Sequence, residues 1–226
     1  MDIKVSKKKQ EMRKDPLVDG MVRAKGYLNE KRQSVTIAAV VVLLVALGVV
    51  FYTQMRNTAL RRADETFGKA VLAYTAQDTD LAVDLFTETA NEHKGTPHAA
   101  YGALMLGSHL LEQGRYEEAL AWYEDASESR NSGFVAAAAL EGIAAAHEGL
   151  GDFQQAQQYL RRALEDNRLD FRKPTLRWKL ALVNRKLNET DEAVELCEDI
   201  VSDSLAMPYH QKARNMLAAL KAGEKS

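Results

Sequence analysis

Residues 106–126 read LGSHLLEQGRYEEALAWYEDA, and this stretch decides the fold because its pattern returns at a fixed interval. An alanine at the start of its second half recurs every 37 residues, as Ala82, Ala119, Ala156 and Ala193. Four positions after these alanines stand Phe86, Tyr123, Leu160 and Cys197, and seven positions after them stand Thr89, Ala126, Ala163 and Ile200. A fixed period of this length is typical of stacked repeat proteins.

Each unit of this period is predicted to be a pair of packed helices. Twelve positions before the four alanines lie small residues, Ala70, Gly107, Ala144 and Ala181. Small residues let two helix backbones approach, and a large residue one turn away fills the space beside them. Gly114 and Gly151 fall between the helices of two units, where glycine adopts a left-handed backbone at little cost. We therefore expect an all-α superhelix of four degenerate repeats.

A fifth, incomplete unit follows the fourth. Leu217-Ala218 lies 37 residues after Leu180-Ala181, so the segment 208–222 is predicted to be one more first helix. Repeat arrays need such a terminal helix to cover their last apolar face. We expect it to act as a C-terminal cap.

These residues resemble the tetratricopeptide repeat, over roughly Asp64 to Ala222. Residues 106–126 are the best match, whereas Lys69, Asn184 and Cys197 stand where the pattern has larger apolar residues. The period exceeds the usual one by three residues, which we assign to longer connections such as 129–134. The resemblance implies a protein-binding scaffold and leaves its partner open.

A second feature, VTIAAVVVLLVALGVVFY at residues 35–52, lies inside an uncharged run from Gln33 to Met55. About 20 such residues span a bilayer core as a helix, so we expect a transmembrane helix over 34–55. The alternatives are an apolar core helix of a soluble protein and a cleaved signal, which the 34 preceding residues disfavour. Helical spacing continues from the run into the first repeat.

The expected domains are a basic cytoplasmic tail at 1–33, the span, and a repeat domain at 56–226. Residues 1–34 hold ten Lys and Arg against five acids, which favours a cytoplasmic N-terminus. The tail also has a helical apolar pattern, formed by Leu17, Met21, Ala24 and Leu28. A helix of this kind would bind the lipid surface or a partner protein. The alternative is that the tail only flanks the span. The repeat domain would then face the periplasm of a bacterial inner membrane, although eukaryotic organelles also use anchored repeats.

The inner face of the first helices is the candidate protein-binding groove, because first helices line the groove in arrays of the family that the sequence resembles. Its residues, by alignment of the units, are Phe67, Val71, Tyr74, Tyr101, Leu104, Ser108, Leu111, Glu141, Ala145, Glu148, Trp178, Leu182 and Arg185. Trp178 and Tyr101 are the leading candidates, with packing between repeats as the alternative role. Glu141 and Glu148 are expected to repel a carboxylate-rich peptide.

No pattern in the sequence indicates an enzyme. The five histidines have no metal-ligand spacing, and no phosphate-binding loop or nucleophile pattern is present, so no metal or cofactor is expected. The single cysteine, Cys197, occupies a packing position and is expected to be buried. Residues 55–226 carry 20 basic and 27 acidic residues, and a net charge of -7 argues against nucleic acid as the partner.

A basic tail, one span and a modest acidic repeat domain together resemble the YfgM-like family of ancillary subunits of the bacterial SecYEG translocon. That resemblance implies work beside the Sec translocon with periplasmic chaperones, and it transfers no particular residue. Two hypotheses follow: an adaptor that recruits a chaperone or translocating chain, and a structural subunit of a larger membrane complex. The oligomeric state stays open.

Overall fold

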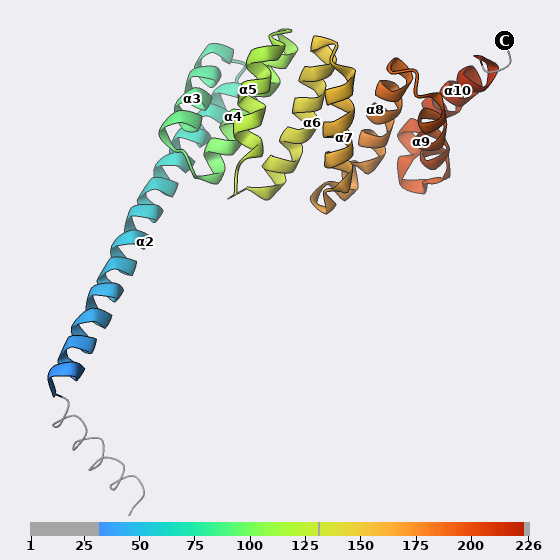
Figure 1. Cartoon of the computed structure of the whole chain (residues 1–226). Coiled ribbons are helices and arrows are strands. Elements are labelled where there is room, and N and C mark those ends of the chain that lie inside the picture. The colour runs from blue at the N-terminus through green and yellow to red at the C-terminus, as the bar shows by residue number, and fades with distance from the viewer. Residues whose placement is uncertain (1–31, 131, 224–226) are drawn as a thin grey trace, which may run out of the picture. The chain divides into compact units, whose positions relative to one another are not determined.

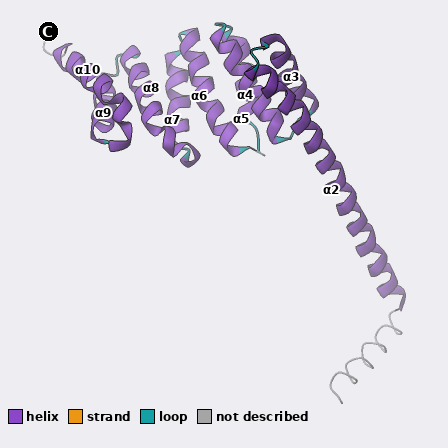
Figure 2. Cartoon of the chain, turned by 180° about the vertical axis from the view of Figure 1, so that it is seen from behind, coloured by secondary structure: helices purple, strands orange, loops and turns teal. Residues whose placement is uncertain are grey.

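The computed structural model describes residues 32–130 and 132–223, and every regular element in these ranges is a helix (Figures 1 and 2). The elements are α2 (Arg32–Thr75), α3 (Thr79–Glu92), α4 (Pro97–Glu112), α5 (Tyr116–Ser127), α6 (Gly133–Leu150), α7 (Phe153–Glu165), η2 (Asn167–Arg172), α8 (Lys173–Lys186), α9 (Thr190–Ser202), η3 (Ser204–Ala206) and α10 (Met207–Gly223). The all-α prediction is confirmed, and the tail helix expected at 17–28 lies outside the described residues.

The chain divides into two units, with the boundary between Asn57 and Thr58. The described part of the first unit is the N-terminal portion of α2, which contains the apolar run. Its large apolar side chains are exposed, including Leu44 at 61% and Val50 at 62%. The helix is long and apolar enough to cross a membrane, and none of its most apolar stretch is buried.

The second unit is a stack of antiparallel helix pairs that follow one another in chain order (Figure 1). The pairs are α4 with α5, α6 with α7, and α8 with α9. The last turns of α2 pack against α3, because Ala70 shares a cluster with Phe86 and the Phe67 ring lies 5.9 Å from the Phe86 ring. First helices also meet, since α4 packs on α6 and α8 packs on α10. These contacts form the layer on which the candidate groove lies.

The repeated small residues occupy the helix contacts that the sequence predicts. Ala82, Ala119, Ala156 and Ala193 are each no more than 1% exposed. The positions four and seven residues later are buried as well, among them Cys197 and Thr89. The 37-residue spacing therefore reflects one steric arrangement that is used four times.

The turns inside the units all contain one residue with a left-handed backbone. Gly114 and Gly151 have φ angles of 74° and 79°, which confirms their predicted role. Gln77 and Asn188 take the equivalent places in the first and fourth units, with φ angles of 63° and 61°. At both positions the left-handed backbone would cost glycine less free energy than it costs a residue with a Cβ atom.

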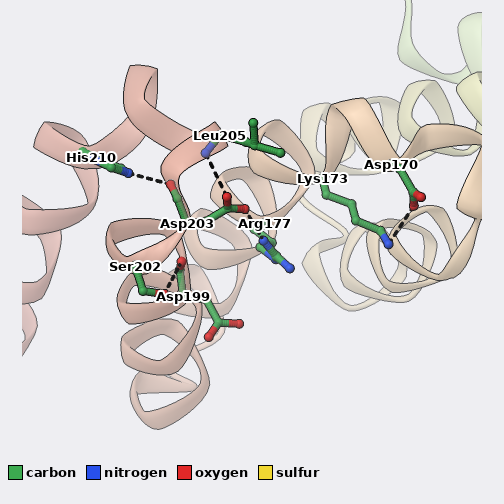
Figure 3. Close-up of polar contacts among 8 residues, drawn as sticks. All are labelled: Asp170, Lys173, Arg177, Asp199, Ser202, Asp203, Leu205 and His210. Atoms are coloured by element: carbon green, nitrogen blue, oxygen red, sulfur yellow. Dashed lines mark hydrogen bonds and ion pairs between the residues drawn. The ribbon is translucent and has the colours of Figure 1, made fainter.

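Short 3-10 helices occupy the last two connections between units. Asp166 and Asp203, 37 residues apart, each use a carboxylate oxygen to accept a backbone N–H two residues later. Asp203 also pairs with Arg177, at 3.0 Å, and its carbonyl accepts a hydrogen bond from His210 (Figure 3). The extra residues of the long period thus form ordered turns here.

The connection expected at 129–134 is shorter than predicted, because α6 already begins at Gly133. The fifth half-unit is present as α10, one residue longer at each end than expected. Ala213 and Met216 of α10 pack in one cluster with Cys197 and Ile200 of α9. This contact covers the end of the apolar core, as expected of a cap.

Candidate protein-binding groove

Two adjoining depressions in the repeat domain share Ala145 and Lys179, and we call them together the central groove. Their volumes are about 390 Å³ and about 410 Å³. The first is lined by Leu104, Ser108, Leu111, Tyr123, Phe134, Ala138, Glu141, Gly142, Ala145, Phe171, Arg172 and Lys179. The second is lined by Ala145, Glu148, Thr175, Trp178, Lys179, Leu182, Tyr209 and Lys212. The groove therefore follows α4, α6, α8 and α10.

Most residues predicted for the groove line it. Leu104, Ser108 and Leu111 from α4 lie in the first depression beside Glu141 of α6. Glu148, Trp178 and Leu182 line the second depression, and Ala145 lies between the two. All of these residues lie on first helices, which explains why an alignment of the repeat units predicted them.

Some of these side chains also hold the fold together. The hydroxyl of Tyr123 donates to Ser108 Oγ at 3.1 Å, and Ser108 donates to the Leu104 carbonyl. A tyrosine hydroxyl is protonated at neutral pH, and burial raises the pKa of Tyr123 further. The Trp178 ring lies 6.3 Å from that of Tyr209 and stays half-buried. Packing and groove lining thus coexist at the same residues.

Five predicted residues lie outside the central groove. Tyr101 is half-buried, and its ring packs 5.9 Å from Phe67. Tyr74 is 56% exposed near Phe86, and Arg185 is exposed at the end of α8. Phe67 and Val71 are absent from the lining as well. Tyr101 is thus the weaker of the two leading candidates, because its ring packs against α2.

An ion cluster in the groove joins the buried carboxylate of Glu141 to two half-buried cations. Arg172 donates two hydrogen bonds of 2.8 Å to the two carboxylate oxygens of Glu141, and Lys179 approaches the same carboxylate at 2.9 Å. Burial alone would raise the pKa of Glu141, but the hydrogen bonds from Arg172 and the charge of Lys179 outweigh burial and lower the pKa. Glu141 therefore stays ionised and paired.

This cluster weakens the argument for repulsion at Glu141, and the expected repulsion of carboxylates stays a prediction. Glu141 is compensated by two cations, so it adds no free negative charge to the groove. Among residues 32–130 and 132–223, no cation lies within ion-pair distance of Glu148, and burial raises the pKa of Glu148 despite the nearby charge of Lys179. A sequence alone does not show this pairing, because Glu141 and Arg172 are 31 residues apart.

Ten residues of the groove lining were absent from the sequence-based set, and those on the repeat helices include Tyr123, Ala138, Gly142, Thr175 and Lys179. Phe171 and Arg172 come from η2, which has no place in the repeat pattern, and Tyr209 and Lys212 come from the capping helix. Phe134 lies at the start of α6, and its ring stacks on that of Phe171 at 6.1 Å. The sequence indicated η2 only through the length of the period, which exceeds the usual one and therefore predicts longer connections between units.

Side chains suited to other chemistry are dispersed. Among residues 32–130 and 132–223, no three His, Cys, Asp or Glu side chains gather in a way that could hold a metal ion. Cys197 is fully buried, and burial raises the pKa of its thiol. The described site therefore offers recognition through apolar, aromatic and charged contacts.

Comparison with known proteins supports the same fold. Two tetratricopeptide repeat models match residues 96–168 and 142–206. No curated protein matched the sequence. Among solved structures, MamA superposes with a TM-score of 0.59 at 20% identity, covering 72% of this chain and 82% of its own.

Two further solved structures share the arrangement. YrrB, described as a tetratricopeptide repeat protein with an unusual peptide-binding site, has a TM-score of 0.56 at 19% identity, with 71% of this chain and 76% of YrrB covered. PilF of Pseudomonas aeruginosa has a TM-score of 0.52 at 21% identity, with 78% and 86% covered. Identities this low define the fold alone.

The stacked helix pairs and the two family matches show that residues 96–206 form tetratricopeptide-like repeats. Proteins of this class are scaffolds for protein–protein interaction and are typically non-enzymatic. The groove residues agree with that general role.

Proposed function

We propose that this protein is a membrane-anchored adaptor of the bacterial cell envelope, whose central groove binds segments of partner proteins. The observation that carries the proposal is the continuous groove across α4, α6, α8 and α10, where half-buried Trp178, Leu104 and Leu111 offer apolar contact. Concave, mostly apolar sites with a few placed charges are typical recognition sites.

The anchor in this proposal is residues 34–55, with residues 1–33 in the cytoplasm and residues 56–226 in the periplasm. The exposed apolar surface of α2 supports the anchor, and the excess of Lys and Arg in the tail supports the orientation. Protease added to intact cells and to spheroplasts tests this topology. The repeat domain should be digested in spheroplasts, and digestion only after cell lysis contradicts it.

The proposed role is support of protein translocation or recruitment of periplasmic chaperones at the inner membrane, with the Sec translocon as a neighbour. It rests on the resemblance of the whole layout to the YfgM-like family. A photo-crosslinking amino acid at Leu111 or Trp178 tests it in living cells, with Gln155 on the second helix α7 as the control position. Varied adducts that include secreted chains or chaperones support the adaptor.

The alternative function is a structural subunit that joins a larger membrane complex. The same crosslinks separate the two, because one fixed neighbour at every groove position favours the structural subunit. Strong crosslinks from Leu44 in the apolar helix, together with none from the groove, contradict the groove function.

A further inference from the structure

We infer that the central groove recognises an extended peptide that carries an apolar side chain and, further along, a carboxylate, with the apolar side chain on Phe134 and Phe171 and the carboxylate between Lys179 and Lys212. This inference rests on the proposed binding function and adds the chemistry of the ligand. It is carried by the different residues that line the two depressions.

The first depression provides the apolar contact. Phe134 and Phe171 are 43% and 68% exposed, yet their rings stack at an interplanar angle of 15°. Leu104 and Leu111 line the same depression from α4. Exposed aromatic side chains beside half-buried leucines are a usual anchor for an apolar residue of a partner.

The second depression provides the positive charge. Lys212 lies 5.8 Å from the centre of the Tyr209 ring and has no carboxylate within ion-pair distance in the described residues. Lys179 shares Glu141 with Arg172, so that carboxylate does not satisfy both cations in full. A further carboxylate from a ligand would complete the charge balance.

The groove charge contrasts with the charge of the domain around it. Arg172, Lys179 and Lys212 give three positive charges against Glu141 and Glu148, a sum of +1 when both acids are ionised. Residues 55–226 as a whole carry a net charge of -7. The groove is thus a locally cationic site on an acidic surface, which directs a carboxylate to it in preference to other sites.

The test uses the full chain in lipid nanodiscs and short synthetic peptides that share one phenylalanine. The peptides differ only in whether Glu, Gln or Lys stands at each other position, and all are amidated at the C-terminus. A second set of Gln peptides with a free C-terminus separates a terminal carboxylate from a side-chain carboxylate. We expect a carboxylate at the best position to improve affinity about fivefold over Gln, and Lys to weaken binding.

Three variants assign the effect to the groove. Lys212→Gln should bring the ratio of Glu to Gln affinities near one, whereas Lys186→Gln, on α8 outside the groove lining, should leave the ratio unchanged. Phe171→Ala should weaken every peptide by a similar factor, because it removes apolar contact only. Lys212 is exposed and has no ion-pair partner in the described part of the chain, so its substitution should change the melting temperature little.

The failures of the two claims are distinguishable. Peptides that bind, weaken in Phe171→Ala and show no preference among Glu, Gln and Lys overturn the ligand chemistry and leave the proposed binding function standing. An acid preference that survives Lys212→Gln also overturns the inference. Absence of all peptide binding, together with absence of groove crosslinks in cells, overturns both.

Discussion

The turns of the four units differ in backbone strain because different residues occupy the position with a positive φ angle. Gly114 and Gly151 adopt positive φ angles without penalty, but Gln77 and Asn188 adopt the same conformation with a Cβ atom. A left-handed backbone costs a non-glycine residue about 1–2 kcal/mol, with asparagine less affected than most. The first unit therefore contains strain that the second and third units lack.

We predict that Gln77→Gly raises the free energy of unfolding by about 0.5–1 kcal/mol, because relief of the strained φ exceeds the added entropy of the unfolded chain. The matched change Gly151→Ala should lower it by about 1 kcal/mol or more, since a Cβ is added at a φ of 79°. Chemical denaturation followed by circular dichroism measures both. Stabilisation by Gly151→Ala contradicts the strain argument.

Glu141 and Glu148 lie in one groove and are predicted to respond to pH with opposite signs. The pKa of Glu141 is lowered in the fold, so its contribution to stability is present above its ordinary range near 4.5 and is lost as the pH falls through the lower folded value. The pKa of Glu148 is raised by burial, so its contribution is present at low pH and is lost as the pH rises through the raised value.

Glu141→Gln should therefore destabilise the protein at pH 7, by about 2 kcal/mol, because Arg172 and Lys179 lose a charged acceptor. Glu148→Gln should stabilise it at pH 7, and the gain should vanish in acid. Melting temperatures between pH 3 and pH 8 measure both effects. Equal effects of the two substitutions across that range contradict the assignment.

At the scale of helices, the ring of Tyr123 determines how closely two neighbouring repeats pack. The Tyr123 ring on α5 lies against Gly107 of α4 and against Gly142 of α6. A Cβ added at Gly107 would lie 2.8 Å from the ring, and one added at Gly142 would lie 2.4 Å from it. Both distances are shorter than carbon atoms tolerate, so glycine is required at both places while the ring is present.

We predict that Gly142→Ala lowers the free energy of unfolding by about 1–3 kcal/mol through this clash, despite the better helix propensity of alanine. Gly68→Ala on α2 is the matched control, because nothing lies within 4 Å of the added Cβ. That change should stabilise the protein by up to about 1 kcal/mol. Thermal melts compare them, and a neutral Gly142→Ala contradicts the clash.

The sequence predicted the helix pairs well because packing contacts recur at fixed positions. Ala82 and Ala193 lie 111 residues apart, in units of different composition, yet both are buried at the same kind of helix contact. The groove was predicted only in part. Arg172 and Phe171 belong to a 3-10 helix outside the repeat pattern, and their partners Glu141 and Phe134 are distant in sequence.

At the scale of the whole array, stability depends on its ends. Cys197 lies under the capping helix α10, in one cluster with Met216, which is 5% exposed. Terminal repeats have neighbours on one side only, so they open more readily than central repeats. The only cysteine of the chain therefore reports on the opening of the C-terminal end.

We predict that Met216→Ala destabilises the fold by about 2–3 kcal/mol and speeds maleimide labelling of Cys197 at least tenfold, because the cavity loosens the cap. Met207→Ala is the matched control on the same helix, since Met207 is 71% exposed, and it should change neither quantity. Labelling is followed by mass spectrometry. Rapid labelling of the unmodified protein contradicts a closed cap.

The shared ring between Gly107 and Gly142 has a consequence for anyone who recombines these repeats. Tyr123 and its two glycines come from three helices and behave as one inseparable set. A transplanted second repeat needs a following repeat that also lacks a side chain at the position of Gly142, or its tyrosine must be exchanged for a smaller residue. Whether two neighbouring repeats are compatible therefore depends on residues of both repeats, and the sequence of one repeat alone does not decide it.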